Sequence, residues 1–230
     1  MHRTLVAAVM IMAGLLAHGG AALAQDAAQP VYIITYIEIA PNSEADARKL
    51  ILGYVADAKQ APGAVQIEGL QRVSDPSHFG LIEQWQSQAA KQAFAATDAA
   101  MKFRATLAPL ETAAYDERIH VALSVGPLVL ESGNPILVMT HVDLVPTQVE
   151  PGTAKVKAFA EQGRTAAGNR RFDDLVQANR KNHFTLVESW DGPADKSKWI
   201  ATPVTRTFRH ELQPMSGALY DERIYRLLRG

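Results

Sequence analysis

Two short motifs in this chain place a carboxylate two residues before a tryptophan: Glu83-Gln84-Trp85 and Glu188-Ser189-Trp190. Residues two apart in a β-strand share a face, so each glutamate would stand beside its tryptophan. A buried carboxylate with a raised pKa can act as a general base, and an indole ring can help to line an aromatic-binding pocket. Glu83 and Glu188 are therefore candidate catalytic bases, and Trp85 and Trp190 are candidate substrate-binding residues.

The same motifs also have a purely structural interpretation. The tryptophans could be core residues of a sheet. Glu83 could instead pair with an arginine such as Arg104 or Arg118. Because both readings fit the alternation of a strand, the sequence leaves them open.

Four further residues could take part in chemistry. Arg104 and Arg209 could stabilise a phenolate, since an oriented cation favours developing negative charge. His141 is a third candidate base, because an ordinary imidazole titrates near neutral pH. Tyr36 stands at the position equivalent to His141 in an internal repeat and is a further candidate for substrate binding.

The repeat has an offset of 105 residues. It carries Tyr115-Asp116-Glu117-Arg118-Ile119 onto Tyr220-Asp221-Glu222-Arg223-Ile224. Sliding residues 33–120 by 105 needs no gap and gives 24 identities over 88 positions. The chain is therefore a duplication of one unit, with predicted domains over 31–124 and 135–228 and a linker over 125–134.

The elements that must position these side chains follow the same order in both units. In the first unit, strands are predicted over 31–40, 65–73, 78–86 and 115–124, with helices that open after Ser43 and Ser87. In the second, strands are predicted near 136–145, 171–178, 183–190 and 219–227, with helices opening near Pro151, Pro193 and Pro203. Strand–helix–strand–strand–helix–strand is the ferredoxin-like split order. A lone sheet of this kind leaves one face uncovered, so we expect an α+β fold in which the two repeats pair as a single-chain dimeric barrel.

The N-terminal segment and the composition limit location and partners. Residues 1–24 have a basic start, an apolar run and Ala22-Leu23-Ala24 before Gln25, which predicts a signal peptide and a periplasmic or secreted protein. The apolar run is short for a membrane span, so no stable span is expected. The formal net charge of −1 and the lack of an evident basic patch argue against a nucleic-acid partner. The chain has no cysteine, no zinc-type histidine spacing and no phosphate-binding glycine loop, so neither a metal nor a cofactor is expected.

A strand ending in Glu-x-Trp, a later helix with Phe103 or Phe208, and a closing Tyr-Asp-Glu-Arg strand resemble the antibiotic biosynthesis monooxygenase domain of the dimeric α+β barrel superfamily. The resemblance covers about 32–120 and 136–227. It implies cofactor-independent oxidation of quinols or polycyclic phenols by molecular oxygen, with a small aromatic substrate as partner. A related branch of the superfamily degrades haem.

The chain departs from that family in one respect. Many members carry two helix histidines, nine and fourteen residues after the tryptophan. Phe94 and Ala99 stand there in the first repeat, and Trp199 and Val204 in the second. Two function classes therefore stay open: a cofactor-free oxygenase, and a non-catalytic exported protein that binds a small molecule or a partner. Further association of whole chains is also left open.

Overall fold

The structure is a computed structural model that describes residues 29–230. The predicted signal peptide over 1–24 lies outside the described residues. The first repeat contains β1 (Val31–Glu38), α2 (Glu44–Gln60), β2 (Ala64–Arg72), β3 (His78–Trp85), α3 (Gln88–Ala95), α4 (Asp98–Leu107) and β4 (Asp116–Ser124). The second contains β5 (Ile136–Asp143), α5 (Val149–Gly163), β6 (Asn169–Gln177), β7 (Arg180–Trp190), α6 (Pro193–Ile200), α7 (Pro203–Leu212) and β8 (Asp221–Leu227). Both repeats thus have the predicted ferredoxin-like order.

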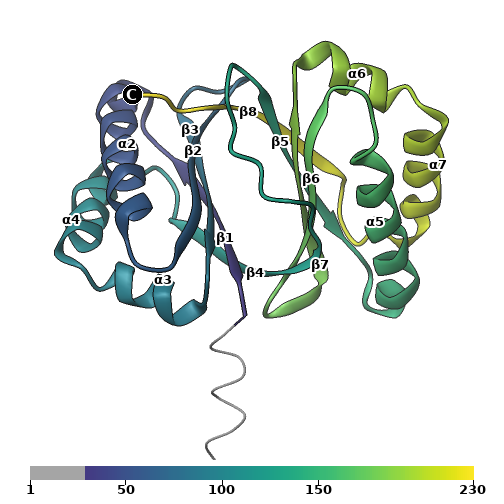
Figure 1. Ribbon diagram of the computed structural model, residues 1–230, viewed down its shortest axis with the longest axis horizontal. Coiled ribbons are helices and arrows are strands. Elements are labelled where there is room, and N and C mark those ends of the chain that lie inside the picture. The colour runs from purple at the N-terminus through teal and green to yellow at the C-terminus, as the bar shows by residue number, and fades with distance from the viewer. Residues whose placement is uncertain (1–28) are drawn as a thin grey trace, which may run out of the picture.

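The strands form one closed barrel in the order β1-β3-β2-β8-β5-β7-β6-β4. Two of its seams join the repeats: Leu70 of β2 pairs with Leu227 of β8, and Val121 of β4 pairs with Val176 of β6. The helices of the two repeats lie on opposite outer sides, with the strands between them (Figure 1). The predicted single-chain dimeric α+β barrel is confirmed, and closure leaves its sheet without free edges.

Short polar residues cap the starts of several helices. The Ser87 side chain accepts a hydrogen bond from the backbone N–H of Ala90 at the start of α3. Thr97 and its equivalent Thr202 cap α4 and α7 in the same way. Such caps satisfy backbone donors that have no partner within the helix. Ser43, the predicted cap of α2, makes no side-chain capping bond, because a short 3₁₀ turn precedes that helix.

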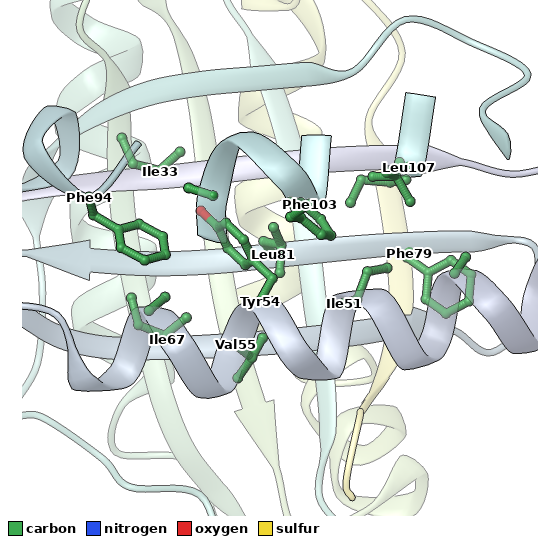
Figure 2. Close-up of a cluster of buried hydrophobic side chains, with 14 of the residues drawn as sticks. Ile33, Ile51, Tyr54, Val55, Ile67, Phe79, Leu81, Phe94, Phe103 and Leu107 are labelled. Atoms are coloured by element: carbon green, nitrogen blue, oxygen red, sulfur yellow. The ribbon is translucent and has the colours of Figure 1, made fainter. Parts of the chain in front are cut away.

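The core has three hydrophobic layers. One lies between the strands and helices of the first repeat, a second lies in the same place in the second repeat, and a third fills the barrel lumen. In the first layer, Tyr54 and Ile51 of α2 project towards Leu81 and Phe79 of β3 (Figure 2). Because side chains alternate along each strand, neighbouring strand residues point to opposite faces of the sheet, one towards the helices and the other towards the lumen. This alternation sorts the candidate site residues.

Candidate functional site

The candidate base of the first repeat, Glu83, is fully buried beneath the helices, and both of its carboxylate oxygens accept hydrogen bonds. Its Oε2 accepts a hydrogen bond from Trp85 Nε1 at 2.7 Å, and its Oε1 accepts one from the Tyr54 hydroxyl at 2.9 Å. Lys91 Nζ on α3 lies 3.1 Å from Oε2 and 3.2 Å from Oε1. A buried charge that is paired and hydrogen-bonded is the arrangement that a folded core tolerates.

The expected pairing of Glu83 with an arginine is wrong. Arg104 instead binds Glu111, and Arg118 binds Asp116. Arg118 cannot reach Glu83 because it points into the lumen, on the other face of the sheet. The cation comes from Lys91, which α3 carries over the helix-facing side of β3.

The second repeat contains an equivalent cluster that lacks the tyrosine hydroxyl. Glu188 accepts a hydrogen bond from Trp190 Nε1 at 2.8 Å, and Lys196 Nζ lies 2.9 and 2.7 Å from its two oxygens. Phe159 replaces Tyr54, so no hydroxyl reaches this carboxylate. Burial raises the pKa of Glu188 above its ordinary value, although Lys196 and Trp190 act in the opposite direction.

Both tryptophans are fully buried core residues as well as hydrogen-bond donors. Trp85 stacks on Phe94, with ring centroids 5.3 Å apart, and Trp190 lies 6.2 Å from the ring of Trp199. Phe94 and Trp199 occupy the first of the two positions that carry histidine in many relatives. In this chain those positions complete an aromatic core.

A pocket of about 930 Å³ opens in the second repeat, between α7 and the start of β8. It is lined by Arg209, Leu212, Gln213, Ser216, Gly217, Ala218, Leu219, Tyr220, Asp221 and Glu222. The Arg209 guanidinium lies over the Tyr220 ring, 5.0 Å from its centroid, and 3.5 Å from Glu222 Oε2. The pocket therefore combines a cation, an aromatic face and two carboxylates, Asp221 and Glu222.

An ionic chain leads inward from this pocket. Glu222 Oε2 lies 3.1 Å from Lys196 Nζ, and Lys196 reaches Glu188 on its other side. Lys196 thus links Glu188 to Glu222, one of the two carboxylates that line the pocket. The sequence did not single out Glu222 or Lys196 as site residues. Strand alternation was the available signal: it turns Glu222 towards the helices and its two neighbours towards the lumen.

Tyr36 and His141 lie in the lumen, on the opposite face of the sheet from the acidic clusters. The Tyr36 hydroxyl is 2.6 Å from His141 Nε2, and Asp221 Oδ2 is 3.4 Å from His141 Nδ1. Burial, helped by the nearby Arg118 charge, lowers the pKa of His141 below its ordinary value. His141 therefore binds a proton less readily than an ordinary histidine, because its surroundings penalise the charged form.

The candidate residues thus divide into three places. Glu83, Trp85 and Arg104 belong to the helix-facing layer of the first repeat; Glu188, Trp190 and Arg209 belong to that of the second. Tyr36 and His141 share the lumen. Within residues 29–230, no helix is long and apolar enough to cross a membrane. The same residues contain no group of three or more His, Asp or Glu side chains arranged to hold a metal ion.

Comparisons with known proteins agree with this architecture. Residues 30–106 match the sequence model of the family "Antibiotic biosynthesis monooxygenase". No curated protein matches the chain. Among solved structures, a protein of Fusobacterium nucleatum described as a candidate monooxygenase is 13% identical with a TM-score of 0.78, covering 88% of this chain and 94% of its own.

Two further structures superpose over most of both chains. A candidate monooxygenase of Lactobacillus acidophilus is 15% identical with a TM-score of 0.71, covering 86% of this chain and 94% of its own. An anthrone oxidase-like protein is 12% identical with a TM-score of 0.68, covering 87% and 92%. At these identities the likeness establishes the fold. Residues 30–106 thus match the antibiotic biosynthesis monooxygenase family, and the whole chain has the fold of these structures.

Proposed function

We propose that the protein is an exported, cofactor-independent monooxygenase that oxidises a quinol-like or polycyclic aromatic substrate with molecular oxygen. The observation that carries this proposal is the pocket of the second repeat, where Arg209, Tyr220 and Glu222 converge. The family match of residues 30–106 and the fold shared with an anthrone oxidase-like protein support the same reaction class.

The pocket residues have distinct roles in this reaction. The Glu222 carboxylate accepts the proton of a phenol or an activated ring carbon, because it lines the pocket beside Arg209 and Tyr220. Arg209 stabilises the resulting anion, and the Tyr220 ring provides an aromatic wall. Lys196 and Glu188 act behind them as positioning residues, since Lys196 contacts both carboxylates.

Deprotonation makes the ring electron-rich enough to react with oxygen directly. For an anthrone-type substrate, a ring CH₂ becomes a carbonyl: one oxygen atom enters the product and the other leaves as water. The CH₂ carbon supplies all four electrons that reduce O₂, so the reaction balances with no further reductant. The protein's part is to bind the ring, take the proton and hold the anion.

Oxygen consumption tests this proposal. Metal-free protein should consume oxygen with a reduced naphthoquinol or an anthrone faster than a no-protein control. Glu222→Gln should lower kcat by about 100-fold or more, the usual contribution of a positioned general base. The matched control is Glu117→Gln, the same change at the equivalent position of the first repeat, which should leave the rate near that of the wild type. Oxygen consumption that never exceeds the spontaneous rate across quinols, phenols and anthrones would contradict an oxygenase.

That outcome would favour a second function, binding without turnover. The specific observation behind it is that the helix histidines are absent. The first of the two histidine positions in each repeat holds a core residue instead, Phe94 or Trp199. An exported barrel of this kind would bind an aromatic molecule in the same pocket. Calorimetry would then show saturable binding of a quinol that the protein does not oxidise.

Export is a separate part of the proposal and has its own test. The basic start, apolar run and Ala22-Leu23-Ala24 site motivate it. Mass spectrometry of the protein from its native host should find a mature chain that starts at Gln25. An intact chain with Met1 in the cytosolic fraction would contradict export.

A further inference from the structure

The charged and aromatic residues around the pocket of the second repeat have equivalents in the first repeat, except at one position. Arg104 and Arg209 are equivalent, as are Tyr115 and Tyr220, Lys91 and Lys196, and Glu117 and Glu222. The entrance differs at one charged position: Glu111 in the first repeat is Ser216 in the second. Both residues form the same kind of isolated backbone bridge, with Ile39 and Leu144 respectively. The backbone is therefore alike at this position, and the side chain is what differs.

In the first repeat, the Glu111 side chain forms an ion pair with Arg104. Arg104 donates to Glu111 through both terminal nitrogens, at 2.8 and 3.2 Å, in a two-point pair. The Glu111 side chain is 9% exposed, so its carboxylate is packed against the protein. The Arg104 guanidinium also lies over the Tyr115 ring, 3.6 Å from its centroid. A two-point pair of this kind fixes the guanidinium and uses the donors that would otherwise bind an anion.

In the second repeat, the equivalent arginine has no such partner. The Ser216 hydroxyl donates to the backbone carbonyl of Leu212 at 3.1 Å and is too short to replace a glutamate. Within the part of the chain that the structure describes, the Arg209 guanidinium has one ionic contact, Glu222 at 3.5 Å. Its side chain is 41% exposed and lines the 930 Å³ pocket. Arg209 can therefore donate hydrogen bonds to a ligand, whereas the terminal nitrogens of Arg104 already donate to Glu111.

We infer that the residue at positions 111 and 216 decides which repeat is a binding site. Serine opens the second repeat to one anionic aromatic ligand per chain, and glutamate closes the first repeat by occupying Arg104. The first repeat then serves mainly to complete the barrel. The ligand class rests on the proposed function, but the number of sites per chain does not depend on turnover.

Exchange variants test this inference by calorimetry at pH 7. The probe is 2-hydroxy-1,4-naphthoquinone, an anionic aromatic that needs no oxidation to bind. Wild-type protein should bind one probe per chain. Ser216→Glu should weaken binding at least tenfold, and Glu111→Ser should raise the number of sites to two. The double exchange should restore one site that now depends on Arg104, so that Arg104→Gln abolishes it and Arg209→Gln does not.

A second measurement needs no ligand. Phenylglyoxal modification, mapped by mass spectrometry, should label Arg209 faster than Arg104 in the wild type, and the order should reverse in the double exchange. Circular dichroism melts of each variant exclude loss of folding as a cause. Two probes per wild-type chain, no probe bound, or unchanged site numbers in Glu111→Ser would overturn the inference. A protein that binds one probe but consumes no oxygen would overturn only the proposed oxidation.

Discussion

Replacing Lys196 with methionine should lower the free energy of unfolding by about 3–5 kcal/mol, the cost typical of removing one partner from a buried ion pair. Methionine keeps most of the side-chain volume but leaves the fully buried Glu188 without its cation. The remaining hydrogen bond, from Trp190, cannot offset the charge. Urea unfolding followed by tryptophan fluorescence at pH 7 measures the loss.

The first repeat supplies a matched control. Lys91→Met removes the equivalent ammonium, but the Tyr54 hydroxyl still donates to Glu83 at 2.9 Å. A hydrogen bond to a charged group contributes about 1.5–3 kcal/mol, so Lys91→Met should be less destabilising than Lys196→Met. Adding Glu188→Gln to Lys196→Met should recover part of the loss, because it removes the unpaired charge. Equal losses at the two lysines would contradict this account of the acidic clusters.

The substitution Asp174→Asn should change how the free energy of unfolding depends on pH. Asp174 of β6 is fully buried, and within residues 29–230 neither of its carboxylate oxygens has a hydrogen-bond partner. Burial raises its pKa to about 8, although Arg164 acts in the opposite direction. Its equivalent in the first repeat is Gly69. Gly69 lies against Ile51 and Val55, and the equivalents of these two residues in the second repeat are the smaller Val156 and Ala160.

The direction of the effect follows from proton binding. Above pH 3.8 the unfolded chain loses the Asp174 proton, while the folded chain keeps it until about pH 8. Stability from this residue therefore falls as pH rises through that window, by about 1.4 kcal/mol per pH unit. Asp174→Asn should remove this slope, so its stability relative to the wild type should rise between pH 4 and pH 8. Urea unfolding at pH 4.5, 6.5 and 8 measures the difference.

His120 makes the free energy of unfolding depend on pH in the opposite direction, and the same experiment measures it. Its Nε2 lies 3.0 Å from Thr185 Oγ1, and burial lowers its pKa to about 4. Because the unfolded histidine binds its proton from pH 6.5 downwards, this residue lowers stability as pH falls from 6.5 to about 4. Between about pH 4 and pH 6.5, the stability of His120→Asn should therefore fall more steeply with rising pH than that of the wild type. Curves for Asp174→Asn that run parallel to the wild type would contradict a buried neutral acid.

Much of the architecture could be predicted because it depends on local pattern and repetition. A gapless offset of 105 residues implies two copies of one unit, and a half-covered sheet needs a partner. Strand alternation likewise placed Glu83 beside Trp85, and Glu188 beside Trp190, on a common face. These conclusions need no knowledge of which distant residues meet, so composition and period were sufficient.

The partners of the site residues could not be predicted, because they depend on how helices cross the sheet. Lys91 and Lys196 reach the buried glutamates only because α3 and α6 pack over β3 and β7. Tyr36 and His141 meet in the lumen because closure of the barrel sets β1 opposite β5, a relation that the offset alone does not contain.

The sequence by itself therefore determined the duplicated α+β barrel and the faces on which its glutamates and tryptophans lie, since both follow from periodicity along the chain. Only the tertiary structure decided that Lys196 pairs with Glu188, that Glu222 faces the pocket, and that Glu111 occupies Arg104 while Ser216 leaves Arg209 exposed. Those contacts join separate elements, and the packing of those elements sets them.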